Sequence, residues 1–177
     1  MLKTIHCGLL ICFLFCGSLL ANVVDHRYQK AFRVQSLSLE DGLSQSVVYD
    51  IIQDRLGFIW VATENGLNRF DGYDFTVFQH SHKDPNSLHD NLTYKLVEDY
   101  QGGIWIGTQN GVSLYNPTTG QFTNFTHYNS DIKTAVQTLA VMPSHNVFIG
   151  SDNGVFVYDR GEDSVSMFND PNGIRIE

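Results

Sequence analysis

The sequence is poor in cysteine, in proline and in positive charge. Its three cysteines, Cys7, Cys12 and Cys16, all precede residue 17 of the 177-residue chain, so the rest of the chain has no thiol for a disulfide, a thiolate metal site or a cysteine nucleophile. The 11 Lys and Arg residues against 19 Asp and Glu residues give a net charge of −8, which argues against binding nucleic acid phosphates. Four prolines against 15 glycines, with 42% hydrophobic residues, indicate an ordered chain with many tight turns.

The N-terminus is predicted to be a helical secretory signal peptide over residues 1–21. Lys3 supplies a cationic start, an apolar stretch follows from Ile5 to Leu20, and Ala21 is a small residue at a cleavage point. The stretch is short for a membrane span, which needs about 20 apolar residues. Leu19 is larger than a cleavage site prefers, so an uncleaved signal anchor is the alternative. Both interpretations predict export, and the lack of cysteine after export favours a bacterial periplasmic protein.

One sequence unit occurs three times, over residues 57–67, 102–112 and 145–155. A large aromatic residue repeats at intervals of 45 and 43 residues: Trp60, Trp105 and Phe148. Each unit has an Asn-Gly pair directly before its last residue, and the glycines of these pairs are Gly66, Gly111 and Gly154. Repetition at about 45 residues is typical of repeat architectures such as propellers. We therefore predict that these three aromatic residues and three glycines are structural core and turn positions.

Each unit is predicted to form four short strands. In the first unit these are residues 47–52, 58–63, 67–70 and 75–78. Asn65-Gly66 between apolar runs is a strong hairpin signal, for a type I′ or a bulged turn. The second strand is apolar at consecutive positions, whereas a strand with one wet face would alternate. Both faces of each sheet are therefore expected to be covered by neighbouring sheets.

These features predict an all-β fold, an incomplete β-propeller of about three four-stranded blades. The blades are placed at residues 44–88, 89–131 and 132–173, preceded at residues 32–43 by one leading strand that closes the ring in a complete propeller. Propellers usually have about four to eight blades. We therefore expect the two end faces to be covered by further blades of a longer chain or by another protomer.

Two stretches carry a resemblance to a known family. Residues 39–47, LEDGLSQSV, and residues 53–72, QDRLGFIWVATENGLNRFDG, closely resemble the opening of two-component regulator propeller repeats. The resemblance covers most of residues 32–173. In the third unit Phe148 replaces the tryptophan, and Asn146 stands where a glycine is expected.

That resemblance implies the periplasmic sensor region of a bacterial membrane signalling protein. Such proteins have a seven-bladed propeller, often a second one, a β-sandwich domain and a membrane span. A histidine kinase, a diguanylate cyclase or a DNA-binding output follows. The resemblance thus implies tethering to the inner membrane and a dimeric receptor.

Ligand binding in a propeller is expected on the loops at one end of the channel. The second-to-third-strand turns and the connections between blades share that end. The candidate residues there are Ser44, Gln45, Ser46, Glu64, Asn65, Gln109, Asn110, Asp152 and Asn153. For the three asparagines, ordinary turn chemistry is the preferred interpretation.

Other candidate sites are weighed against simpler roles. Trp60 and Trp105 are candidate stacking platforms for a sugar, but a strand covered on both faces favours a core role. His80, His82 and His89 have a spacing compatible with zinc, but solvated loop histidines are favoured, so no metal and no cofactor is predicted.

Asp54 and Asp99 precede tight turns. They lack the surrounding residues of a calcium loop, so a structural role is favoured.

The sequence contains none of the common catalytic motifs, and no catalysis by this chain is predicted. The favoured function is a ligand-sensing periplasmic propeller that binds an extracytoplasmic small molecule such as a glycan fragment. Two alternatives stay open: a protein-interaction scaffold and an exported propeller lyase.

Overall fold

The computed structural model describes residues 34, 36–125, 132 and 134–168. The chain divides into two compact units, Met1–Ser36 and Leu37–Glu177, and every element below lies in the second. The predicted signal peptide at residues 1–21 lies outside the described residues.

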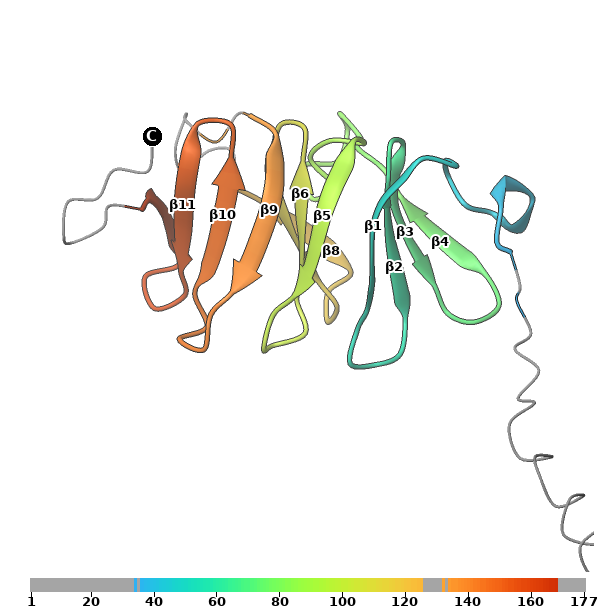
Figure 1. Ribbon diagram of the computed structural model, residues 1–177, viewed down its shortest axis with the longest axis horizontal. Helices are drawn as coiled ribbons and strands as arrows, with labels where there is room; N and C mark the ends of the chain where they lie inside the picture. The colour runs from blue at the N-terminus through green and yellow to red at the C-terminus, as the bar shows by residue number, and fades with distance from the viewer. Residues whose placement is uncertain (1–33, 35, 126–131, 133, 169–177) are drawn as a thin grey trace, which may run out of the picture. The chain divides into compact units, whose positions relative to one another are not determined.

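Three four-stranded antiparallel sheets follow one another along the chain, each with its strands in chain order (Figure 1). The first contains β1 (Val48–Gln53), β2 (Ile59–Thr63), β3 (Gly66–Phe70) and β4 (Phe75–Phe78). The second contains β5 (Thr93–Glu98), β6 (Ile104–Thr108), β7 (Gly111–Asn116) and β8 (Gln121–Asn124). The third contains β9 (Val136–Val141), β10 (Val147–Ser151), β11 (Gly154–Asp159) and β12 (Ser164–Met167). The predicted all-β fold with four-stranded blades is confirmed, and β1, β5 and β9 lie side by side as the first strand of each blade.

The predicted leading strand at residues 32–43 is not found in the described part of that segment. Instead, Leu39–Asp41 forms a 3₁₀ turn. The Ser38 side chain accepts a hydrogen bond from the Glu40 N–H, and the Asp41 carboxylate accepts one from the Ser38 N–H at 2.7 Å. Gly42 ends the turn with a φ of +101°. These local bonds form a capping box, so the backbone here is satisfied without a neighbouring strand.

The second-to-third-strand turn of each blade is the bulged hairpin and not the type I′ turn. Its glycine has positive φ in all three blades: +113° at Gly66, +115° at Gly111 and +118° at Gly154. The asparagine before each glycine does not, whereas a type I′ turn needs positive φ at both central residues. At Gly66 a Cβ would also lie 2.6 Å from the Phe78 carbonyl oxygen. Glycine is therefore required there by conformation and by space.

The hydrophobic core lies between the sheets. Trp60 of β2 packs on Tyr115 of β7 with ring centroids 5.0 Å apart, and Trp105 of β6 packs on Tyr158 of β11 at 4.8 Å. Both tryptophans are almost fully buried, at 1% and 0% exposed. All five residues of β6 are buried. The consecutive apolar pattern of this strand follows from its position in the middle blade, which is covered on both faces.

The outward faces of the first and third blades are uncovered in the described chain. Ile51 of β1 is 59% exposed, whereas the residues at the same position of the next two blades, Leu96 and Leu139, are 2% and 7% exposed. At the other end Phe148 is only half-buried, and it contacts the partly exposed Phe168. Phe148 thus holds the predicted core position without the burial of the two tryptophans.

This difference predicts unequal effects of equivalent substitutions. Leu96→Ala is expected to lower the free energy of unfolding by about 2–5 kcal/mol, because it opens a cavity between two blades. Ile51→Ala is expected to change it by no more than about 0.5 kcal/mol, because Ile51 contacts solvent in this chain. Urea denaturation of both variants measures the difference. Equal losses would show that the face around Ile51 is covered.

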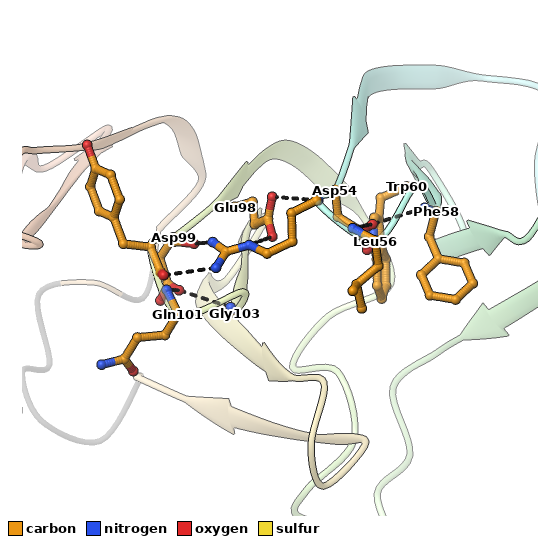
Figure 2. A network of polar contacts seen from close by, with 10 residues as sticks. Asp54, Leu56, Phe58, Trp60, Glu98, Asp99, Gln101 and Gly103 are labelled. Carbon is orange, nitrogen blue, oxygen red and sulfur yellow. Dashed lines mark hydrogen bonds and ion pairs between the residues drawn. The ribbon is translucent and has the colours of Figure 1, made fainter.

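An aspartate fixes the tryptophan of each of the first two blades, and Figure 2 shows Asp54 beside Trp60 and Asp99 beside Gln101 and Gly103. One Asp54 oxygen accepts the N–H groups of Leu56 and Phe58 at 3.0 and 2.9 Å, and the other accepts the Trp60 indole N–H at 2.8 Å. Asp99 makes the equivalent bonds to the N–H groups of Gln101 and Gly103 at 2.8 and 2.9 Å and to the Trp105 indole at 3.1 Å. The structural role predicted for both aspartates is confirmed.

The third blade lacks both members of this pair. Met142 stands at the position of the aspartate and Phe148 at that of the tryptophan, so neither an indole donor nor a carboxylate acceptor is present. The turn nevertheless has the same shape, because His145 takes a positive φ of 72° where the other blades have Gly57 and Gly102. The position of this turn that requires positive φ, where glycine is expected, is therefore residue 145 and not residue 146.

Candidate ligand-binding site

The candidate site lies at one end of the sheets, where each first strand begins beside the turn between the second and third strands. Val48 at the start of β1 pairs with Thr63 at the end of β2, and Thr93 of β5 pairs with Thr108 of β6 in the same way. This register brings the predicted turn residues to the beginnings of the first strands. Most of the predicted residues are exposed there: Ser46, Glu64, Asn65, Gln109, Asn110, Asp152 and Asn153.

Three residues that sequence reasoning missed belong to this end. They are Tyr49, Tyr94 and Gln137, near the start of each first strand. The Tyr94 hydroxyl donates a hydrogen bond to the Gln109 side-chain oxygen, and the Gln137 amide donates one to Asp152 at 3.2 Å. Each bond joins a first strand to the turn of the same blade. The signal was available in the sequence, because these residues repeat at the same intervals of 45 and 43 residues as the core aromatic positions.

The two tyrosines bring neighbouring blades together at this end. The rings of Tyr49 and Tyr94 lie 5.1 Å apart at an angle of 79°. Below them, the Lys95 ammonium lies 2.9 Å from an Asp50 carboxylate oxygen, which also accepts the Leu96 N–H at 2.9 Å. These contacts join β1 to β5, so the aromatic pair stands on two contacting strands of neighbouring blades.

The end around Tyr94 is acidic. Burial raises the pKa of the Tyr94 hydroxyl, and the neighbouring Tyr49, Asp90, Asp152 and Glu64 raise it further. Because its pKa lies above the ordinary value of about 10, the hydroxyl is protonated at neutral pH and remains a hydrogen-bond donor. The site therefore offers aromatic rings, amides and carboxylates, and the Tyr94 hydroxyl holds the Gln109 amide in place.

Some predicted residues are engaged within the protein. The Ser44 hydroxyl lies 3.0 Å from the Thr63 hydroxyl and accepts the Asn68 amide at 2.8 Å, which ties the segment before β1 to the first blade. The Ser46 hydroxyl donates to the Gln45 side-chain oxygen at 3.1 Å.

Two of the turn asparagines also have partners. Asn65 accepts the Gln79 amide at 3.1 Å, and the Asn110 amide donates to the Asp90 carboxylate. These bonds agree with the turn and loop roles preferred for the asparagines.

Two features are absent from the described part of the chain. Over residues 34, 36–125, 132 and 134–168, no three or more His, Cys, Asp or Glu side chains are already arranged to hold a metal ion. The same residues contain no helix that is both long and apolar enough to cross a bilayer.

Comparison with known proteins agrees with this architecture. The family model of the two component regulator propeller matches residues 42–65 and 87–110. Among solved structures, the extracellular domain of BT4673 from B. thetaiotaomicron, described as a one component system, aligns with a TM-score of 0.60 and 26% identity over 75% of this chain and 18% of its own. That of BT3049 from the same organism, described as a hybrid two component system, aligns with a TM-score of 0.50 and 24% identity over 78% of this chain and 28% of its own.

A curated relative extends the likeness. A protein of Formosa agariphila named histidine kinase P4 is 46% identical over 57 residues, which are 32% of this chain and 4% of that protein. This chain thus spans less than a third of each of these relatives.

The three sheets are blades of a β-propeller of the kind found in extracellular domains of bacterial signalling systems. More narrowly, residues 42–65 and 87–110 of the first two blades match the two component regulator propeller.

Proposed function

We propose that this chain is the ligand-sensing propeller portion of a membrane-bound signal-transduction receptor, exported to the periplasm and without catalysis of its own. The observation that carries the proposal is the repeated pairing of a first-strand side chain with a turn side chain at one end of successive blades. The pairs Tyr94–Gln109 and Gln137–Asp152 have this arrangement. The two component regulator propeller matches and the extracellular signalling domains with similar structures support the sensor class.

The ligand class follows from the side chains at this end. Tyrosine rings present flat apolar faces, and amides and carboxylates accept and donate hydrogen bonds to hydroxyl groups. Glu64, Asp90 and Asp152 make the end negative, and the Lys95 charge is paired with Asp50. An uncharged, polyhydroxylated molecule such as a neutral glycan fragment fits these groups, whereas an anionic ligand would meet like charge.

Signalling in this proposal depends on neighbours beyond the described blades. The exposed Ile51 face and the half-buried Phe148 face favour contact with further propeller blades or another protomer. Ligand binding at the blade ends would bias packing between protomers of a dimeric receptor, and the shift would pass through the membrane to an output domain.

Tyr94→Ala is expected to weaken binding of a neutral oligosaccharide about tenfold, equivalent to about 1.4 kcal/mol, because it removes an aromatic face and the hydroxyl that positions the Gln109 amide. Tyr73→Ala is the matched control, because Tyr73 is 89% exposed in the turn before β4. A thermal-shift screen against neutral and acidic oligosaccharides, followed by calorimetry, measures both variants.

The screen also tests the proposal itself. A rise in melting temperature with neutral sugars that Tyr94→Ala abolishes would support it. No shift with any oligosaccharide, or equal losses in the two variants, would contradict it and favour the protein-interaction scaffold.

A further inference from the structure

A pair of histidine rings lies in contact on the connection between the first and second blades. His80 and His82 follow β4, two residues apart. The Nε2 atom of His80 lies 3.2 Å from the Nδ1 atom of His82, and the ring centroids are 4.6 Å apart at an angle of 88°. From the sequence, solvated loop histidines are the favoured interpretation, because residue spacing does not specify where the ring nitrogens point. The structure supplies that direction.

The protonation of His80 is set by its second partner. Its Nδ1 atom lies 2.9 Å from the Leu88 carbonyl oxygen, which can only accept a hydrogen bond, so Nδ1 carries the proton. In the neutral ring Nε2 then has a free lone pair, and it accepts from His82 Nδ1–H. A ring N–H held by a backbone carbonyl, with the other nitrogen directed outward, is the usual arrangement of a metal-binding histidine.

We propose that His80 Nε2 and His82 Nδ1 bind one divalent transition-metal ion of the zinc class, with His89 as the third ligand. Two nitrogen ligands of tetrahedral zinc lie about 3.3 Å apart, because each Zn–N bond is about 2.0–2.1 Å long. The observed 3.2 Å is the length of an N–H···N hydrogen bond, so the two nitrogens already have about the separation that one ion requires, and the rings tilt on binding so that both lone pairs face the ion. Imidazole nitrogens suit Zn²⁺, Cu²⁺ and Ni²⁺.

Two local changes accompany binding. His82 moves its ring proton from Nδ1 to Nε2 by exchange with solvent, so the ring stays neutral and no net proton is released. The His89 ring, whose centroid is 6.3 Å from that of His80, turns toward the ion. This rotation is required because the three rings are not already arranged as a complete ligand set.

The ion would stabilise the connection between two blades. His80 and His82 follow the last strand of the first blade, and His89 precedes the first strand of the second. The connection is already attached at other points: the His80 N–H donates to Asn91 at 2.7 Å, and the Phe122 N–H of β8 donates to the Asn86 carbonyl at 2.9 Å. A metal bound by residues on both sides of the connection would add to these contacts, so it is expected to raise the melting temperature.

The experiment titrates the untagged chain with ZnCl₂ by calorimetry and with CoCl₂ by visible absorption. One ion per chain, tetrahedral cobalt bands and a higher melting temperature are expected. His82→Ala is expected to weaken Zn²⁺ binding about tenfold or more. His145→Asn is the matched control, because His145 is another exposed histidine and asparagine tolerates its positive φ.

Each outcome decides part of the proposal. No binding, unchanged affinity in His82→Ala, or an equal loss in His145→Asn would overturn the site. His89→Ala tests the third ligand: weaker Zn²⁺ binding with altered cobalt bands supports its role, and unchanged binding removes His89 from the site. None of these results depends on a sugar ligand.

Discussion

Trp105→Ala is expected to lower the free energy of unfolding by about 3–5 kcal/mol, among the largest effects of single substitutions in the described blades. The Trp105 side chain is 0% exposed, and its ring packs between Phe125 of its own blade and Tyr158 of the next, with centroids 5.2 and 4.8 Å away. Removing the indole opens a cavity between two blades and leaves Asp99 without one of its donors. Chemical denaturation followed by circular dichroism measures the loss.

Phe148→Ala is the matched control for this prediction. Phe148 occupies the same repeat position, but it is half-buried and its recorded ring partner is Phe168, itself 37% exposed. Its loss is therefore expected to be clearly smaller than that of Trp105→Ala. Equal losses would contradict the assignment of the blade interfaces as the main source of stability.

Asp99→Ala is expected to cost about 3–5 kcal/mol, because the carboxylate is buried and satisfies four donors. Two are backbone N–H groups of the turn, the third is the Trp105 indole, and the fourth is the Arg160 guanidinium of the third blade. Asp99 is 3% exposed, so water cannot replace the lost acceptor without opening the interface. Asp71→Ala, at an exposed turn that satisfies only backbone N–H groups, is the control and is expected to lose much less.

The third blade suggests a double-mutant cycle that measures the coupling between Asp99 and Trp105. Because Met142 and Phe148 replace the aspartate and the tryptophan together there, Asp99→Met and Trp105→Phe are expected to be non-additive. The double variant should lose less stability than the sum of the single variants, by about 0.5–3 kcal/mol. Denaturation of all four proteins completes the cycle. Strict additivity would show that the indole–carboxylate bond contributes nothing beyond the separate contacts.

The strand pattern was largely predictable because it depends on local chemistry that recurs. The observed bounds of β4, Phe75–Phe78, equal the predicted ones, and β1 is displaced by one residue from its prediction. The bulged turn at Gly66 was one of two types compatible with Asn-Gly, and the sequence left both open. The leading strand at residues 32–43 stays a prediction: Leu39–Asp41 forms a 3₁₀ turn with a capping box at Ser38, and a strand in this segment would need a partner from another blade.

The candidate site was only partly predictable. The turn residues Glu64, Gln109 and Asp152 were placed correctly at one end, because the hairpin register fixes where a turn lies. Tyr49, Tyr94 and Gln137 were missed, because a side chain near the start of a strand reveals its position relative to a turn only through strand pairing. The hydroxyl of Ser44 is taken up by Thr63 and Asn68, which come from other strands.

The repeat, the four-stranded unit and the burial of its tryptophans follow from the order of amino acids alone, because they depend on the spacing of apolar residues and glycines within about 45 residues. The folded arrangement was needed to show which blade contacts are complete, that Arg160 contacts Asp99 although 61 residues separate them, and that two histidine nitrogens lie 3.2 Å apart. Those contacts depend on side-chain directions between elements distant in the chain or on a loop without regular structure, where residue spacing does not specify direction.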